Sequence, residues 1–548
     1  MIEPPDENQQ AFEDPLYVPV GPITKARSKK IKEAINGLIQ EIWVDSNVGH
    51  SKLGPKEDEG GVTWDANGHV VGLDLSSESI SGGFNSSSSL FNLQYLQSLN
   101  LAGNSFCGGL NWPNNNFCSS QIPSGFDRLA NLIYLNLSNS GFSGQIPKEF
   151  SLLTRQSAEG KEWCQALSSS VPNLQVLSLS SCHLSGPIHS SLQKLRSLSR
   201  IRLDDNNFAA PVPQFLASFS NLTHLQLSSC GLTGTFPEKI IQVTTLQILD
   251  LSINLLEDSL PEFPQNGSLE TLVLSDTKLW GKLPNSMGNL KKLTSIKLAR
   301  CYFSGPILNS VANLPQLIYL DLSENKKSPP VPVFPPILAE VTTRQQPNFW
   351  LTTLPDLSGQ SSLTHLDLSQ NQIHENIPSW IWKIGNGSLV YLNLSHNLLE
   401  DLHEPFSTFT PYLSILDLHS NQLHGQIPTP PIFCSYVDYS NNSFTSSIPE
   451  DIGTYIFFTI FFSLSKNNIT GIIPASICNA SYLRFLDFSD NALSGMIPSC
   501  LIGNEILEDL NLRRNKLSAT IPGEFSGNCL LRTLDLNGNL LEGKFQTL

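Results

Sequence analysis

Three cysteines share one position of a recurring sequence pattern and could in principle carry chemistry. Cys182, Cys230 and Cys301 each end a short Leu-rich segment, as in "LQVLSLSSC" and "LTSIKLARC". A thiolate is a nucleophile and a ligand for soft metal ions, so catalysis and metal binding both have to be considered. Reactive cysteines need exposed, electropositive surroundings, whereas these three follow apolar segments. We therefore interpret them as buried structural thiols.

No other group of residues forms a recognisable catalytic pattern. The sequence has no Gly-rich phosphate loop after a strand, no HExxH and no CxxC pair. Ser and Asp are frequent because the repeated strand motif is of the "LDLS" type, and a catalytic triad is identified by geometry rather than by abundance. The sequence predicts a protein that is not an enzyme and that has no cofactor and no metal site.

A repeat positions these residues. Rows such as "LQILDLSINLLEDSLP" (246–261) and "LRFLDFSDNALSGMIP" (483–498) follow the template LxxLxLxxNxLxGxIP, from residues 70–84 to residues 531–545. The period of about 24 residues lies in the range of leucine-rich repeats, which contain one short strand each. The Leu residues of LxL point inward and stack on those of neighbouring rows, while the residues between them point outward.

The Asn of the template is expected to satisfy buried backbone groups where the chain leaves the strand. Stacked rows then form a ladder, in which Cys takes the place of Asn in three rows. Gly permits a backbone angle that a side chain would hinder, and Pro fixes the turn that follows. The predicted ladder positions include Cys182, Asn206, Cys230, Asn254, Cys301 and Asn325.

The LxGxIP half of the template resembles the plant-specific class of leucine-rich repeats. Finer matches are "GVTWDANGHVVGLDLSSESISGG" (61–83), "KEWCQALSSSVPNLQVLSLSSCHLSGPI" (161–188) and "IPSWIWKIGNGSLVYLNLSHNLLEDL" (377–402). They are similar to receptor-like proteins of the Verticillium wilt resistance type, which are immune receptors without a kinase. The resemblance covers about residues 61–548 and implies an α/β solenoid. This solenoid is a right-handed superhelix with a parallel β-sheet on its concave face and a mostly 3-10 or irregular convex side.

The resemblance also implies a function. It indicates a ligand-recognition ectodomain of a plant cell-surface receptor-like protein that acts in pathogen perception and defence. The implied partners are a protein or peptide ligand of microbial origin and a leucine-rich repeat receptor kinase as co-receptor. The implied location is the extracellular face of the plasma membrane. Two alternatives stay open, namely a secreted inhibitor of a microbial cell-wall-degrading enzyme and a non-functional product of a truncated gene.

The chain departs from the family pattern at its ends and at two joints. Residues 1–60 have neither a signal-peptide pattern nor the cysteine pair of the family's N-terminal cap, and the chain stops within a repeat, so we expect a chain truncated at both ends. We divide it into a largely disordered segment (1–60), a remnant of the N-terminal cap with the first repeat (61–90), a repeat array (91–325), a Pro-rich joint or degenerate repeat (326–360) and a second array (361–548). A second irregular step, through "LTRQSAEGKE" (153–162), interrupts the first array. Both joints are interpreted as lost or scrambled repeats rather than inserted loops.

Residues 21–43 form a basic stretch that predicts an amphipathic helix at about 24–43. The stretch resembles a segment of plant retrotransposon gag polyproteins, which favours a foreign exon. A basic helix would also permit binding to nucleic acid or to a membrane surface.

For the chain as a whole, the net charge of −15 argues against nucleic acid as a partner. Its longest apolar run, "YIFFTIFF" (455–462), is too short to span a bilayer and is interpreted as buried core.

The outward strand positions predict the binding surface. Arg and aromatic residues are the usual anchors of interfaces. The candidates are Arg200, Arg202, Asp204, His224, Gln226, Lys297, Arg300, Tyr319, Glu324, His365, Tyr391 and His396. Sequons for N-glycosylation occur at Asn85, Asn136, Asn221, Asn266, Asn386, Asn393, Asn441, Asn468 and Asn479. A glycan on Asn136 or Asn393 would block the face, because both are outward strand positions. No sequon falls on an outward strand position in the window 174–370, so this window is the first place to expect a ligand.

We also predict a local disulfide between Cys107 and Cys118, which is consistent with an exported protein.

Overall fold

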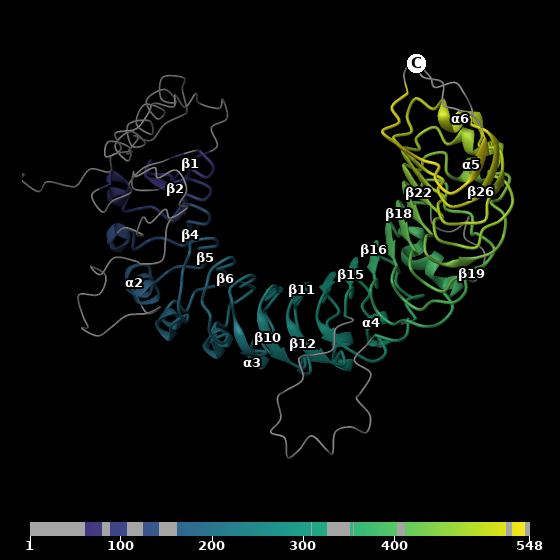
Figure 1. Cartoon of the computed structure of the whole chain (residues 1–548). Helices are drawn as coiled ribbons and strands as arrows, with labels where there is room; N and C mark the ends of the chain where they lie inside the picture. The colour runs from purple at the N-terminus through teal and green to yellow at the C-terminus, as the bar shows by residue number, and fades with distance from the viewer. Residues whose placement is uncertain are drawn as a thin grey trace, which may run out of the picture. The chain divides into compact units, whose positions relative to one another are not determined.

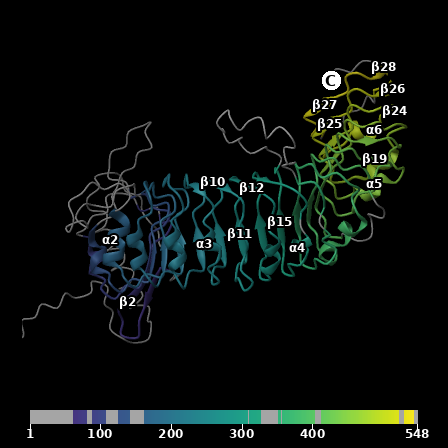
Figure 2. The same cartoon turned by 90° about the horizontal axis from the view of Figure 1, so that it is seen from below.

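The computed structural model describes residues 61–78, 80, 88–106, 124–141, 162–307, 309–325, 351–354, 356–402, 411–521 and 529–542. The chain forms two compact units, residues 1–256 and 257–548, and this boundary falls inside the predicted array 91–325. Each unit is a stack of rows, each of which contributes one short strand to the main sheet (Figures 1 and 2). In the second unit, helices α5 and α6 lie on the side opposite strands β18 and β22 (Figure 1).

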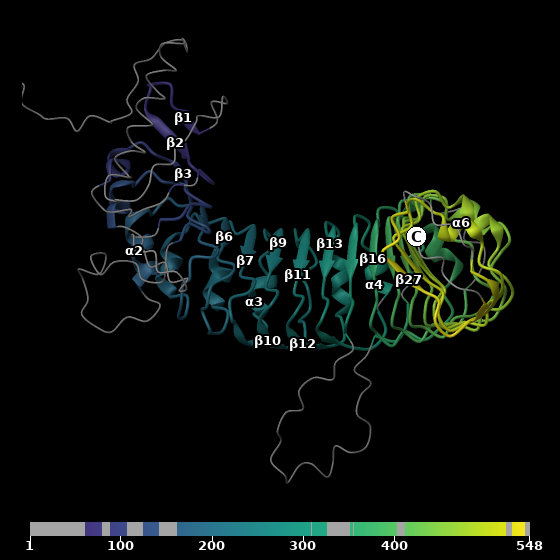
Figure 3. The same cartoon turned by 45° about the horizontal axis from the view of Figure 1, so that its top comes forward.

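The first unit begins with the strands β1 and β2, which are visible at one end of the stack in Figure 3. Its strands are β1 (Val62–Trp64), β2 (Val70–Asp74), β3 (Ser98–Asn100), β4 (Tyr134–Asn136), β5 (Val176–Ser178), β6 (Arg200–Arg202), β7 (His224–Gln226), β8 (Thr233–Thr235) and β9 (Ile248–Asp250). Its helical segments are η1 (Ser89–Asn92), η2 (Ser124–Arg128), α2 (Glu162–Ser170), η4 (Ser190–Lys194), η5 (Gln214–Ser218) and α3 (Glu238–Ile241).

The second unit repeats this alternation of strands and short helices. The main strands are β11 (Thr271–Val273), β13 (Ser295–Lys297), β15 (Tyr319–Asp321), β16 (His365–Asp367), β17 (Tyr391–Asn393), β18 (Ile415–Asp417), β20 (Tyr436–Asp438), β22 (Phe461–Ser463), β23 (Phe485–Asp487), β25 (Asp509–Asn511) and β27 (Thr533–Asp535). Lesser strands are β10 (Leu255–Asp258), which starts at the unit boundary, β12 (Lys278–Gly281), β14 (Tyr302–Phe303), β19 (His424–Gly425), β21 (Ser443–Phe444), β24 (Ser494–Gly495), β26 (Lys516–Thr520) and β28 (Leu540–Glu542). The helical segments are η6 (Asn285–Asn289), α4 (Asn309–Ala312), η8 (Ser379–Gly387), α5 (Ile452–Tyr455), η9 (Ala475–Asn479) and α6 (Ser499–Ile502).

The three-residue strands of successive rows pair in parallel and in register. Strand β1 is the exception among the described main-sheet pairings, because it runs antiparallel to β2. In each typical row the middle strand residue is buried and its two neighbours face outward, as Leu225 does between His224 and Gln226. This alternation follows from the period of two along a strand. The solenoid fold predicted from the sequence is therefore confirmed.

A ladder of polar side chains holds the rows together behind the strands. The Asn254 amide nitrogen donates to the carbonyl oxygens of Leu227 (2.8 Å) and Leu251 (2.9 Å). Its amide oxygen accepts from the backbone N–H groups of Cys230 (3.1 Å) and Leu232 (2.9 Å). One buried amide thus satisfies backbone groups of two rows that would otherwise have no partner. Asn206 and Asn325 make the corresponding contacts in their rows.

The residue before each ladder position adopts a left-handed backbone conformation. Examples are Asp205 (φ 55°), Ile253 (φ 53°) and His396 (φ 53°). Positive φ is unfavourable for a β-branched residue such as Ile253, so the amide bonds of the following Asn must compensate for this strain. The Gly of the LxGxIP segment has positive φ as well, for example 82° at Gly471. The sequence had indicated a special angle only at this Gly.

The cysteines at ladder positions donate weak hydrogen bonds into the same network. The Cys182 Sγ lies 3.2 Å from the Leu137 carbonyl oxygen, and the Cys230 Sγ lies 3.1 Å from that of Leu203. The Cys301 Sγ donates to the Leu274 carbonyl oxygen at 3.3 Å. Burial raises the pKa of Cys182 and of Cys230 to about 12, and that of Cys301 to about 11. These thiols therefore stay protonated, which makes them poor nucleophiles.

This burial predicts the reactivity of the three thiols. In the folded chain at pH 8, Cys182, Cys230 and Cys301 are expected to resist a thiol-specific reagent, and to react after denaturation, as read by mass spectrometry of labelled peptides. Their ordinary pKa is 9.0, so the stability that their protonated forms contribute is complete below pH 9 and falls as the pH rises toward 12. Labelling of these cysteines at native pH without unfolding would contradict their structural role.

Two neighbouring strands bracket the Pro-rich joint. Strands β15 and β16 pair directly, with Tyr319 opposite His365, although a long stretch of sequence separates them. Leu351 bridges to Gly305, and the Gln360 side-chain amide donates to the Ala312 carbonyl oxygen at 2.7 Å. Leu351 and Gln360 thus contact the row that contains α4, and the interpretation of the joint as lost or scrambled repeats stays a prediction. Strands β4 and β5 pair in the same way across the other irregular step.

A disulfide joins Cys478 and Cys500, whose Cα atoms are 5.7 Å apart. The sequence alone did not suggest this pairing, because the two cysteines belong to successive rows and only the stacking of these rows brings them together.

Three predictions lie outside the described residues, namely the Cys107–Cys118 bridge, the basic helix at 24–43 and the sequon at Asn85. None of the helices in the described part of the chain is both long and apolar enough to cross a bilayer.

The prediction that "YIFFTIFF" is buried core is wrong for three of its eight residues. Ile456 and Phe462 are buried, but Phe457, Phe458 and Ile460 are between 36% and 41% exposed. Phe458 stacks on Phe433, at 5.4 Å between ring centroids, on the surface of the unit. The run spans a turn and a three-residue strand, so only the residues that face the stack are covered.

Candidate functional site

An uninterrupted line of mostly aromatic side chains crosses the outward face of the second unit's sheet. We call this line the aromatic stripe; it consists of Tyr319, His365, Tyr391, Ile415, Tyr436, Phe461 and Phe485. Each residue is the first of its strand, and each is paired in register with the next. All seven side chains are half-buried, so one side of each remains accessible. The stripe ends at Ser295 on one side and at Asp509 on the other.

The rings of the stripe stack on one another across rows. Centroid distances are 5.4 Å for Tyr319 and His365, and 6.0 Å for His365 and Tyr391. Tyr436 and Phe461 are closest, at 4.5 Å with an interplanar angle of 9°. Stacked rings have little freedom to rotate, so a ligand that binds them loses little side-chain entropy. The stripe is thus a rigid apolar track.

A line of acidic residues runs beside the stripe, two positions further along each strand. We call it the acidic line; its members are Asp321, Asp367, Asp417, Asp438 and Asp487, with Asn393 and Ser463 in the two intervening rows. Most accept a bond from the backbone N–H two residues ahead, as Asp438 does from Ser440 at 2.9 Å. Burial raises the pKa of Asp367 and of Asp438. The hydrogen bond to Asp417 raises the pKa of His419.

The predicted binding residues fall in two different units. Arg200, Arg202, Asp204, His224 and Gln226 belong to the first unit, where Arg200 and Arg202 are the exposed ends of β6. Asp204 is not a free acceptor, because it receives hydrogen bonds from the backbone N–H (3.0 Å) and hydroxyl (3.1 Å) of Ser228. Burial raises its pKa. These five residues remain predicted binding residues.

The other predicted residues lie in the second unit, and several of them are already engaged. The Lys297 ammonium lies 4.9 Å from the centre of the Tyr319 ring. The Arg300 guanidinium bridges Asp276, at 2.9 Å, and Glu324, at 3.2 Å, across three rows. Such surface ion pairs contribute little to stability but fix the position of the guanidinium. Tyr319, His365 and Tyr391 form one end of the aromatic stripe.

The list of predicted residues ended at His396 and so missed the four stripe residues that follow Tyr391. Ile415, Tyr436, Phe461 and Phe485 occupy the same strand position in later rows. Aligning the rows on their LxL segments would have found them. The sequence prediction instead weighed the residues one at a time, so the line that they form across the rows was not recognised. The potential glycan position Asn393 lies on β17, and its amide nitrogen is 3.3 Å from the Tyr391 hydroxyl.

Comparisons with known proteins agree with the observed architecture. The Leucine Rich Repeat family model matches residues 131–153, 173–195, 221–242, 268–290, 362–384 and 460–480. A second model, also described as Leucine rich repeat, matches residues 483–541. The described residues of both sets of matches lie in rows of the stack, so the family models and the structure identify the same repeat.

The relatives of the chain are plant proteins. It is 31% identical over 535 residues to Receptor like protein 24 of Arabidopsis thaliana, covering 86% of this chain and 54% of that protein. Receptor-like protein 7 of the same plant is 43% identical over 237 residues, which is 43% of this chain and 23% of that protein. The chain thus spans about half or less of the length of these relatives.

Solved structures of plant receptors share the fold. The Arabidopsis receptor kinase HAESA, in complex with the peptide hormone IDA and the co-receptor SERK1, is 28% identical with a TM-score of 0.69, covering 94% of this chain and 90% of that one. The leucine-rich repeat ectodomain of GASSHO1/SCHENGEN3 from Arabidopsis thaliana is 26% identical with a TM-score of 0.68, covering 92% and 61%. Together with the repeat template and the relatives above, these findings show that the chain belongs to the plant leucine-rich repeat receptor-like proteins.

Proposed function

We propose that the chain is the ligand-recognition part of a plant receptor-like protein, and that the aromatic stripe binds a peptide. The observation that carries this proposal is the continuous line of half-buried side chains, in which two groups of stacked rings are joined through Ile415. Contiguous apolar surface on a soluble protein marks an interaction site. HAESA and GASSHO1/SCHENGEN3, which share the fold, were each solved in complex with a peptide or protein factor.

The length of the stripe fits an extended peptide. Neighbouring parallel strands lie about 4.8 Å apart, so the row-to-row steps from Tyr319 to Phe485 span roughly 29 Å. An extended chain advances about 3.3–3.6 Å per residue, so about eight or nine residues would cover this length. The peptide would run across the strands, so side-chain contacts rather than β-sheet hydrogen bonds hold it.

The chemistry of the two lines predicts the composition of the peptide. Rings of Tyr and Phe bind apolar and aromatic side chains, and they also attract the cations of Lys and Arg. The acidic line provides carboxylates beside the rings, of which Asp321 and Asp487 are half-exposed. A peptide that combines apolar residues with Lys or Arg is therefore the favoured ligand. A strongly acidic peptide would be repelled.

The finer parts of this function rest on the sequence resemblance. We place the receptor at the plasma membrane, on its extracellular face, acting in pathogen perception and defence without a kinase of its own. The ligand is then a microbial peptide or protein, and a leucine-rich repeat receptor kinase serves as co-receptor. The complex of HAESA with a peptide and a co-receptor supports such a partner in a protein of the same fold.

Binding along the stripe requires that Asn393 carries no glycan. A sugar on the Asn393 amide nitrogen would lie next to Tyr391, because this nitrogen is 3.3 Å from the Tyr391 hydroxyl. Glycopeptide mass spectrometry of the chain secreted from plant cells is expected to find Asn393 unmodified. A fully occupied site at Asn393 would exclude the centre of the stripe as a peptide-binding surface, whatever the state of the other sequons.

Selection from a displayed random peptide library tests the proposed function. The purified 548-residue chain is the bait, and a variant with Tyr391→Ala, Tyr436→Ala and Phe461→Ala is the counter-bait. We expect enriched peptides to carry apolar and basic residues and to bind the unchanged chain only. Peptides that bind both baits equally would show that the stripe is not the binding surface.

A further inference from the structure

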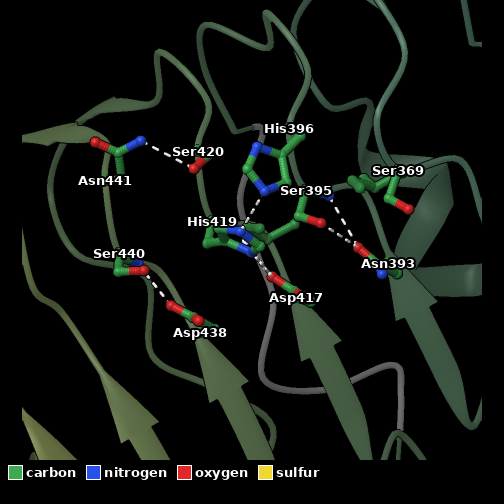
Figure 4. Close-up of polar contacts among 12 residues, drawn as sticks. Ser369, Asn393, Ser395, His396, Asp417, His419, Ser420, Asp438, Ser440 and Asn441 are labelled. Atoms are coloured by element: carbon green, nitrogen blue, oxygen red, sulfur yellow. Dashed lines mark hydrogen bonds and ion pairs between the residues drawn. The ribbon is translucent and has the colours of Figure 1, made fainter. Parts of the chain in front are cut away.

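Two histidines and two aspartates meet on the sheet face at the edge of the acidic line. The Nδ1 of His419 lies 2.7 Å from the Asp417 Oδ1, and its Nε2 lies 2.8 Å from the Nε2 of His396 (Figure 4). Asp438 is paired in register with Asp417 on the next strand. Ligand atoms of Asp417, His419 and Asp438 lie within 4.8 Å of one another. Figure 4 shows the two imidazole rings directed toward each other from adjacent rows.

The geometry of the two rings places one proton between them and directs both Nε2 atoms at the same point. Two imidazole nitrogens at hydrogen-bond distance cannot both present lone pairs, so one proton must lie between the Nε2 atoms. Asp417 accepts only from an N–H group, which places a proton on His419 Nδ1 and leaves its Nε2 for the contact with His396. A carboxylate that accepts from one ring nitrogen and thereby directs the other nitrogen toward a second ligand is the arrangement that orients a metal-binding imidazole.

From this geometry we propose that His396 and His419 bind a divalent transition-metal ion of the zinc class through their Nε2 atoms, in place of the shared proton. Two nitrogens bound to one zinc ion at about 2.0–2.1 Å in tetrahedral geometry lie roughly 3.3 Å apart. The rings must therefore separate by about half an ångström from their present 2.8 Å. His396 is exposed, so its ring is not enclosed by the core.

The ion would be only partly enclosed by protein groups. The two histidines supply two ligands, and Asp417 acts as a positioning residue that holds the His419 ring. Asp438 adds negative charge nearby, which favours a cation over a neutral occupant. The remaining coordination positions face the sheet surface, where water or a side chain of a bound ligand could fill them. Imidazole ligands select zinc, copper and nickel over magnesium and calcium.

Zinc titration of the purified 548-residue chain by calorimetry tests this site. We expect one zinc ion per chain, with affinity weakened at least tenfold by His396→Asn and by His419→Gln. Asparagine is chosen at position 396 because it tolerates the left-handed backbone there. The exposed histidines His374 and His424 provide matched controls, and His374→Ala and His424→Ala are expected to leave affinity unchanged. Circular dichroism of each variant establishes that it is folded.

The positioning role of Asp417 is tested by a separate measurement. Asp417→Asn is expected to keep the stoichiometry at one, to lower the affinity, and to change the visible absorption of bound cobalt, which reports the ligand geometry. Absence of zinc binding by the unchanged chain up to about 1 mM would overturn the proposal. So would undiminished binding by the His396→Asn/His419→Gln double variant. Binding that is lost in Asp438→Asn but kept in His396→Asn would move the ion to the Nδ1 side of His419 and overturn the assignment to the two Nε2 atoms.

Discussion

Replacing Asn254 with alanine is expected to lower the free energy of unfolding by roughly 3 kcal/mol or more. The side chain is 4% exposed and serves the backbone of two rows. Its loss leaves the N–H groups of Cys230 and Leu232, together with the Leu227 and Leu251 carbonyl oxygens, without this partner. Water cannot easily replace a buried amide, so the full desolvation cost of these groups remains. Denaturant unfolding followed by circular dichroism measures the change.

Two further variants serve as controls for this prediction. Cys230→Ala removes the ladder group of the preceding row, whose thiol makes only weak bonds to the Leu203 and Ser228 carbonyl oxygens, so we expect a loss of about 1 kcal/mol. Asn173→Ala removes an exposed amide and is expected to change stability by less than about 0.5 kcal/mol. Equal losses for Asn254→Ala and Asn173→Ala would show that the amide ladder does not hold the rows together.

Replacing Tyr436 or Phe461 with alanine is expected to weaken peptide binding by about 10- to 100-fold. These two rings form the tightest stack of the stripe, with 4.5 Å between centroids, and both have stripe residues on either side. Interface energy concentrates in central aromatic residues that are already ordered before binding. The dissociation constant of a peptide selected on the unchanged chain, measured by calorimetry, gives the effect.

The controls for this prediction separate ring stacking from other effects. Tyr436→Phe keeps the ring and removes only the hydroxyl, which is 3.4 Å from the Asp438 carboxylate, so we expect a change below about threefold. Trp280→Ala removes an exposed aromatic residue on β12, outside the strands of the stripe, and should leave binding unchanged. Unchanged affinity in both Tyr436→Ala and Phe461→Ala would reject the stripe as the binding surface.

The repeat fold could be predicted because its determinants are local and periodic. The inward Leu residues and the ladder Asn recur at the same positions of each row, so the structure expected for one row can be carried over to the next. The buried thiols of Cys182, Cys230 and Cys301 could be understood for the same reason. The pairing of β15 with β16 could not, because a long stretch of sequence without the repeat lies between them and only a non-local contact determines it. The disulfide between Cys478 and Cys500 is likewise a contact between rows.

The candidate sites depend on side chains from several rows, which explains why the sequence revealed them only in part. Tyr319, His365 and Tyr391 were predicted as separate contacts, whereas their register makes them one surface with Tyr436 and Phe461. The contact between His396 and His419 joins different positions of two successive rows. A row-by-row alignment does not place these residues together, because their meeting depends on side-chain rotamers.

Photo-crosslinking of a selected peptide to the full chain tests the central claim most directly. A photoreactive residue is placed at the centre of the peptide, and the linked chain fragments are identified by mass spectrometry. The account predicts crosslinks to strands β15 to β23, concentrated at Tyr391, Tyr436 and Phe461. Crosslinks concentrated on the helical side of the rows, at α5, η9 or α6, would contradict it.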